Sequence, residues 1–205
     1  MIEQRKPPSL ILASNSQIRR DLLTNAGLNF KTCVSPVDEE AIKKANTHLI
    51  PKDLVQTLAY EKALAVSKSP DFSNDFIIGA DQIMVFEDQV FDKPKDRDDA
   101  KHHLIMMRGK SHQLLSAWSL LYQGVAVASF CDVATLTMRD FSDDFLKHYL
   151  NDCWGDIRWC VGCYQLEGKG IQLFDKIEGD YHTILGLPLL PLLKELRRHQ
   201  VGIVS

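Results

Sequence analysis

The sequence lacks long apolar runs and has no marked excess of one charge. No stretch approaches the roughly 20 consecutive apolar residues of a membrane-spanning helix, and residues 1–8 lack the apolar core of a signal peptide. The formal net charge of −3 gives no reason to expect a surface that binds nucleic acid or an anionic membrane. We therefore expect a cytoplasmic protein with no nucleic-acid or membrane partner.

Cysteine is too infrequent for a disulfide-rich scaffold, with 5 residues in a chain of 205, and in the cytoplasm these thiols should be reduced. Cys160 and Cys163 form a CxxC motif, a pattern that can bind zinc or act in redox chemistry. A second pair with ligand spacing is missing, and no histidine lies close by in the sequence. We favour structural thiols and keep a metal or redox role as the alternative.

The 205 residues are enough for one large or two small domains, and no linker or repeat divides them. Strand-like runs alternate with helical spacing, which favours an α/β fold with a sheet flanked by helices. The expected strands are 10–13, 29–34, 76–86, 112–122 and 125–138, with a hairpin turn at 87–89. The expected helices are 19–26, 52–67, 98–107, 142–150 and 186–198. The acidic residues 38–40 are expected to lie on an irregular loop, and the stretch 153–170 is rich in glycine and cysteine.

The first strand and helix enclose a polar turn. Ser14–Ser16 follow the apolar run 10–13 and favour a helix start, and Gly27 favours its end. A helix N-terminus beside hydroxyl groups suits phosphate, and Arg19 can add a bidentate contact. Taken alone, the segment is more simply explained as a capped surface helix with solvated arginines. It is not a Walker loop, because the glycines of that motif are missing.

Asp81 lies inside the apolar run 76–86, where an aspartate is unusual and costly to bury unpaired. It either faces a cleft as a site residue or belongs to a buried network, and we favour the first. Gly79 beside it permits a close backbone approach. Lys62, Lys93 and the acidic residues 38–40 are each unremarkable alone. Together with Asp81 and the serine-rich turn they supply the groups for Mg²⁺-assisted chemistry on a phosphate chain.

Eight short motifs follow one another along nearly the whole chain. They are Leu12-Ala-Ser-x-Ser-x-x-Arg19, Val37-Asp-Glu39, Glu61-Lys-Ala63, Gly79-Ala-Asp-Gln82, Lys93-Pro94, Arg108-Gly-Lys-Ser-His112, Gly162-x-Tyr-x-x-Glu-Gly168 and Gly186-Leu-Pro-Leu189. Each motif is weak by itself. Their order resembles the Maf family of nucleoside triphosphate pyrophosphatases, long called septum formation inhibitors.

The resemblance implies a single domain over residues 1–205. Its expected fold is an elongated mixed sheet with flanking helices in two lobes and a cleft between them, similar to the inosine triphosphate pyrophosphatases. It implies a hydrolase of nucleotide metabolism that converts a nucleoside triphosphate to the monophosphate and pyrophosphate with a divalent metal, Mg²⁺ or Mn²⁺. A homodimer is compatible with the family, although no stretch of the sequence marks an interface.

The resemblance also assigns roles to individual residues. Asp81 matches the catalytic base of the family. The residues that match phosphate-binding positions are Ser14, Arg19, Lys62 and Lys93, those near the metal are Glu39 and Asp81, and those for base selection are Ile18, Gln82 and Glu167.

Gln82 and Glu167 match the branch associated with 7-methyl-GTP, whereas the dTTP/UTP branch usually has Thr and Gln there. That branch also usually has Asp-Lys-Ala-Gly-x-Tyr where this chain has the stretch 159–164. Ile18 departs from the Trp usual in the 7-methyl-GTP branch. We expect a housecleaning pyrophosphatase that favours a 7-methyl-GTP-like substrate. One alternative is a dTTP/UTP pyrophosphatase. Another, from a different class, is a non-catalytic nucleotide-binding regulator of septum formation. The presence of Asp81 together with several cations argues against this regulator.

Overall fold

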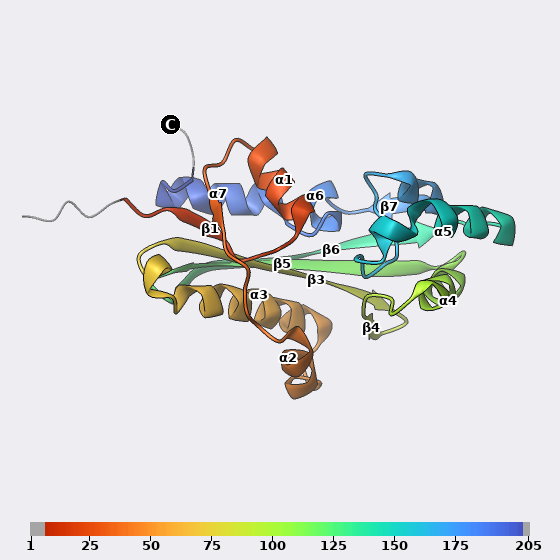
Figure 1. Ribbon diagram of the computed structural model, residues 1–205, viewed down its shortest axis with the longest axis horizontal. Coiled ribbons are helices and arrows are strands. Elements are labelled where there is room, and N and C mark those ends of the chain that lie inside the picture. The colour runs from red at the N-terminus through yellow and green to blue at the C-terminus, as the bar shows by residue number, and fades with distance from the viewer. Residues whose placement is uncertain (1–6, 203–205) are drawn as a thin grey trace, which may run out of the picture. The chain divides into compact units, whose positions relative to one another are not determined.

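The structure is a computed structural model that describes residues 7–202, so most of the segment searched for a signal peptide lies outside the described residues. Its strands are β1 (Leu10–Leu12), β2 (Lys31–Thr32), β3 (Phe76–Phe86), β4 (Gln89–Phe91), β5 (Ser111–Tyr122), β6 (Val125–Met138) and β7 (Phe174–Glu178). They form a seven-stranded sheet in the order β2-β1-β3-β5-β6-β7, with β4 paired to β3 (Figure 1). β1 is parallel to β2 and β3, whereas β4 is antiparallel to β3 and β7 to β6. The predicted mixed sheet is confirmed.

The helices flank this sheet, as predicted for an α/β protein. They are α1 (Gln17–Asn25), α2 (Glu39–Ala45), α3 (Pro51–Ser67), α4 (Arg97–Met107), α5 (Asp143–Ile157), α6 (Tyr181–Ile184) and α7 (Leu189–His199), with short 3₁₀ helices at Pro70–Phe72 and Lys169–Leu173. Several of these helices begin at a residue whose side-chain oxygen accepts a hydrogen bond from an otherwise unpaired N–H of the first turn. Ser16 caps α1 and Ser142 caps α5. Among the described residues, no helix is both long and apolar enough to cross a membrane.

The chain divides into two compact units. The first contains the residues up to Asp81, the segment Ser116–Asp132 and the chain from Leu185 onward. The second contains Gln82–Leu115 and Val133–Ile184. Strands β3, β5 and β6 contribute one segment to each unit, and each unit has its own buried hydrophobic cluster.

In the first unit, helices cover both faces of the sheet. α3 lies on one side, and α1 and α7 lie on the other (Figure 1). Successive residues of a strand point to opposite faces, and β1 is accordingly apolar on both. Leu10 and Leu12 join the cluster with α1 and α7, whereas Ile11 and Ala13 join the cluster with α3. A strand buried on both sides reads as a continuous apolar run, and this is why β1 could be predicted.

Gly79 lets α3 approach β3 more closely than any other residue would allow. A Cβ at this position would lie 2.0 Å from the carbonyl oxygen of Ala59 and 2.6 Å from the amide nitrogen of Ala63, both on α3. Real Cβ atoms do not approach backbone so closely. The close approach predicted for Gly79 is therefore confirmed, and its partner is α3.

In the second unit, α4 and α5 pack together over an apolar cluster that includes Leu104, Leu146 and Tyr164. Two buried polar contacts lie inside this cluster. The Tyr149 hydroxyl donates to the carbonyl oxygen of Cys163 at 3.1 Å, and His112 Nε2 lies 2.7 Å from the Tyr164 hydroxyl. Burial lowers the pKa of His112 to about 4, so its ring is neutral near pH 7.

Several boundaries differ from those predicted. The strand expected over 29–34 is reduced to the two residues of β2, and α7 begins at Leu189 rather than at 186. The acidic residues 38–40 are not irregular, because Asp38 caps α2 and the two glutamates form its first turn. The helix expected over 142–150 continues to Ile157, and β7 was not predicted.

Candidate active site

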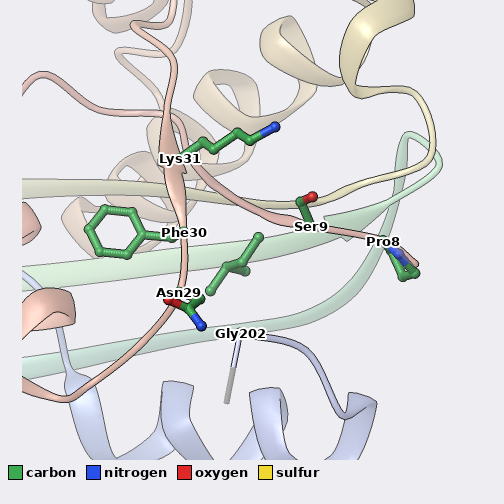
Figure 2. A pocket seen from close by; sticks show the side chains of 7 residues that line it. Pro8, Ser9, Asn29, Phe30, Lys31 and Gly202 are labelled. Carbon is green, nitrogen blue, oxygen red and sulfur yellow. The ribbon is translucent and has the colours of Figure 1, made fainter. Parts of the chain in front are cut away.

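The predicted site residues do not line the pocket that Figure 2 shows. That hollow has a volume of about 340 Å³ and lies beside the start of β1 and of β2. Its lining residues are Pro8, Ser9, Leu10, Asn29, Phe30, Lys31 and Gly202. Ser14, by contrast, follows the other end of β1. Ser14 thus lies beyond the carboxyl end of β1, and the carboxyl ends of parallel strands are where α/β sheets usually bind ligands.

The turn after β1 brings Ser14 to the buried side chain of Arg19. The Ser14 hydroxyl accepts hydrogen bonds from the amide of Ser16 at 3.2 Å and from Arg19 Nη1 at 3.4 Å. The Ser16 hydroxyl accepts from the amide of Arg19 at 3.4 Å and so starts α1. Ser14 and Arg19 are each only 8% exposed. The two phosphate-binding residues predicted in this segment therefore lie together.

Backbone carbonyls hold the guanidinium of Arg19 in place. Its Nε donates to the carbonyl of Gly186 and its Nη1 to the carbonyl of Ala80, both at 2.9 Å. Burial lowers the pKa of Arg19, and the nearby carboxylates of Asp81 and Glu39 oppose that shift. An arginine keeps its charge in proteins, so this part of the first unit holds a fixed positive charge.

Three elements bring Lys62 between two carboxylates. Lys62 Nζ, on α3, lies 2.6 Å from Asp81 Oδ1 on β3 and 2.8 Å from Glu39 Oε1 at the start of α2. The side chains of Lys62 and Asp81 are only 10% and 9% exposed, whereas that of Glu39 is 45% exposed. Charge-assisted hydrogen bonds of this length are among the stronger ones in proteins.

The two carboxylates of this cluster suit a divalent ion that is also bound by the phosphate groups of a substrate. Glu39 and Asp81 supply hard carboxylate oxygens that converge on one point. Among the described residues, no group of three or more His, Cys, Asp and Glu side chains is arranged to hold a metal. Mg²⁺ is commonly bound by one or two carboxylates together with substrate phosphates, rather than by protein ligands alone. The two carboxylates suit that kind of binding.

Of the residues predicted to select the base, Ile18 and Gln82 are engaged in packing and backbone contacts. Ile18 is partly buried against the apolar cluster of the first unit. In the second unit, Gln82 Nε2 donates to the carbonyls of Thr183 and Ile184, at 3.1 and 2.9 Å. Gln82 thus directs its amide nitrogen to the end of α6.

Lys93 and Glu167, the other two predicted residues of the second unit, are exposed. Both lie near the thiol of Cys160. Burial is the main cause that raises the pKa of Cys160 to about 11, with Glu167 adding to the shift and Lys93 opposing it. Burial likewise raises the pKa of Cys163 to about 12. Both thiols of the CxxC motif are therefore protonated at neutral pH, and a protonated thiol is a poor nucleophile.

The sequence did not reveal which backbone groups orient these side chains. The carbonyls of Ala80 and Gly186 fix Arg19, and those of Thr183 and Ile184 fix Gln82. Every residue has a backbone carbonyl, so no sequence motif shows which carbonyl will accept a hydrogen bond. Helix α2, which carries Glu39, did have a signal. An aspartate cap, two glutamates in the first turn and two lysines in the last turn are typical of a short helix.

Comparison with known proteins agrees with the motifs. The model of the Maf-like protein family matches residues 9–199. The chain is 44% identical over 190 residues to a 7-methyl-GTP pyrophosphatase of Rhizobium johnstonii, covering 93% of this chain and 96% of that protein. It is 45% identical over 195 residues to the 7-methyl-GTP pyrophosphatase of Brucella suis, with the same coverage. A nucleoside triphosphate pyrophosphatase of Nitrobacter hamburgensis is 41% identical over 194 residues, covering 94% and 95% of the two chains. The predicted resemblance is confirmed, and the chain belongs to the Maf family.

Proposed function

We propose that this protein is a nucleoside triphosphate pyrophosphatase that hydrolyses its substrate to the monophosphate and pyrophosphate. The observation that carries the proposal is the buried cluster in which Lys62 joins Asp81 and Glu39 beside the fixed guanidinium of Arg19. Two cations and two carboxylates that suit a metal, one of which is Asp81 as the proposed base, are the groups that this reaction needs. Removal of unwanted nucleotides from the cellular pool is the role that fits such an activity.

In the proposed reaction, water attacks the α-phosphate and the bond to the pyrophosphate group breaks. The carboxylate of Asp81 positions the water and accepts its proton. Arg19 donates to phosphoryl oxygens, and its backbone contacts keep it oriented before the substrate binds. Lys62 neutralises charge on the departing pyrophosphate. A divalent ion held by Glu39 and Asp81 would supply further neutralisation of the phosphate chain. Ser14 and Lys93 are proposed as additional phosphate ligands.

We further propose that a guanine-type triphosphate, 7-methylated in the preferred case, is the substrate. Glu167 offers only acceptor atoms, which suit the N1–H and the exocyclic amino group of guanine. Thymine and uracil present one N–H between two carbonyls, and those oxygens repel a carboxylate. Methylation at N7 makes the purine cationic and its N1–H more acidic, so the hydrogen bond to Glu167 strengthens. The names of the Rhizobium and Brucella relatives support this choice.

The variant Asp81→Asn tests the central assignment. It keeps the size of the side chain but removes the negative charge, and we expect kcat to fall by a factor of about 10² or more. The measurement is pyrophosphate release from 7-methyl-GTP, GTP, dTTP and UTP, with circular dichroism to establish that the variant is folded. The exposed Asp71, in the first 3₁₀ helix, provides a matched control, because Asp71→Asn should leave the rates unchanged.

Three outcomes would change the proposal. Normal turnover by Asp81→Asn would remove the catalytic role of Asp81. A kcat/KM for dTTP or UTP above that for every guanine nucleotide would favour the pyrimidine branch. Binding of nucleotide by the wild-type protein without any pyrophosphate release would favour the non-catalytic regulator.

A further inference from the structure

Lys62 occupies the position between two carboxylates that a divalent ion would need. Its Nζ lies 2.6 Å from Asp81 Oδ1 and 2.8 Å from Glu39 Oε1. Asp81 accepts a hydrogen bond from Lys62, and Glu39 forms an ion pair with it. We propose that Lys62 is a resident cation that the divalent ion displaces, so that metal binds firmly only together with a triphosphate. This inference rests on the proposed function and adds an order of binding to it.

Steric exclusion is the first argument. Mg²⁺ binds oxygen ligands at about 2.0–2.1 Å, so an ion held by both Glu39 and Asp81 would need the space that the ammonium group of Lys62 now occupies. The two cations therefore compete for the same pair of oxygens. Moving Lys62 aside without giving it a new partner would leave a largely buried ammonium group unpaired, and an unpaired buried charge is costly.

Charge balance is the second argument. Lys62 and Arg19 carry two positive charges, and Asp81 and Glu39 carry two negative ones, so the free cluster is neutral. Arg19 is close enough for both carboxylates to affect its pKa. A divalent ion entering alone would therefore add two uncompensated positive charges to a site in which Arg19, Lys62 and Asp81 are largely buried. A triphosphate supplies the missing negative charge and also new oxygens for Lys62.

The difference between the two cations is the third argument. Arg19 is tied to two backbone carbonyls and to Ser14, so it stays in place. Lys62 has a flexible four-carbon stem and a compact charge with three rotatable donors. Only Lys62 can transfer from carboxylates to phosphate oxygens without breaking backbone contacts. Metal and nucleotide should then raise each other's affinity by the same factor, as linkage requires.

Mn²⁺ binding, followed by the electron paramagnetic resonance signal of the free ion at pH 8, tests this inference. For the wild-type protein, an α,β-methylene guanosine triphosphate analogue should raise Mn²⁺ affinity at least about tenfold. A parallel titration without protein corrects for Mn²⁺ bound by the analogue itself. The variant Lys62→Met should bind Mn²⁺ at least about tenfold more tightly than wild type without the analogue, and should lose most of the coupling.

The variant Lys44→Met is the matched control. Lys44 forms an exposed ion pair with Glu40 on α2, so this variant changes the net charge equally and should bind Mn²⁺ as wild type does. Equal Mn²⁺ affinity in Lys62→Met and wild type would overturn the inference. Two results with the wild-type protein would also overturn it: an Mn²⁺ affinity that the analogue leaves unchanged, or no Mn²⁺ binding with or without the analogue. Both wild-type results are independent of whether the variant folds. If the wild-type protein hydrolyses no triphosphate, the proposed function fails on that separate assay.

Discussion

Replacing Gly79 with alanine should push α3 away from β3 and thereby disturb the site. The added Cβ would lie 2.0 Å from the carbonyl oxygen of Ala59 and 2.6 Å from the amide nitrogen of Ala63. Carbon and carbonyl oxygen are normally no closer than about 3.3 Å, so the helix must move by roughly 1 Å. Both obstructing atoms belong to helix backbone, which cannot rotate aside as the end of a long side chain can.

This displacement has a cost in stability and a cost in rate. Overpacking a core costs about 1–3 kcal/mol, and we expect the upper end because backbone atoms are involved. Asp81 lies two residues after Gly79 and therefore on the same face of β3, while Lys62 precedes Ala63 on α3. The 2.6 Å contact between Lys62 and Asp81 should lengthen. A misplacement of about 1 Å can lower the rate by about 10².

Urea unfolding followed by circular dichroism measures the first effect, and pyrophosphate release measures the second. Gly155→Ala in α5 is the control, because a Cβ there would have no neighbouring atom within 4 Å. That variant should gain up to about 1 kcal/mol, since alanine is the better helix former, and should keep its activity. If Gly79→Ala retains both the unfolding midpoint and the kcat/KM of wild type, Gly79 does not set the spacing between α3 and β3.

Three further predictions concern the second unit. Glu167→Gln should shift the kcat/KM ratio of guanine-type to pyrimidine triphosphates by about tenfold toward the pyrimidines. The control Glu178→Gln on β7 should leave this ratio unchanged. An unchanged ratio in Glu167→Gln would show that Glu167 does not select the base. The double variant Cys160→Ser, Cys163→Ser should keep its activity within a few-fold of wild type. Elemental analysis of the wild-type protein should find no stoichiometric zinc. One zinc per chain in wild type, lost in the double variant, would show that the CxxC motif binds metal. His112 should lower the free energy of unfolding by at most about 3 kcal/mol between pH 6.5 and pH 4, because its folded pKa is about 4 and the unfolded chain therefore binds the proton first. Urea midpoints of His112→Gln should fall less steeply over that range than those of wild type, and an equal slope would refute the assignment.

The elements that could be predicted from the sequence are those whose burial determines their composition. β3 was predicted with its observed bounds, Phe76–Phe86, because nearly all of its residues are buried and apolar. α3 was predicted to within one residue, since Leu54, Val55, Leu58 and Ala59 repeat at helical spacing on its inner face. In both cases the local pattern and the tertiary packing give the same answer.

The elements that were missed lack such a pattern. α2 has no buried residue, so it shows no apolar stripe. β7 has five residues, none of them fully buried, and it is a strand because it pairs with β6. The end of α5 contains Gly155, which reads as a helix stop. The helix nevertheless continues because Cys153 and Ile157 extend its buried face by one further turn.

The same distinction applies to the site. Asp81 could be identified from the sequence because a carboxylate inside an apolar strand is a local anomaly, visible in a window of a few residues. Its pairing with Lys62 and Glu39 could not, because these residues are 19 and 42 positions away and their meeting depends on where three elements pack. The spacing of two of those elements is set at Gly79, where a side chain would collide with α3. We therefore expect the distance between Lys62 and Asp81 to depend on a residue that has no side chain, and the Gly79→Ala variant measures that dependence directly.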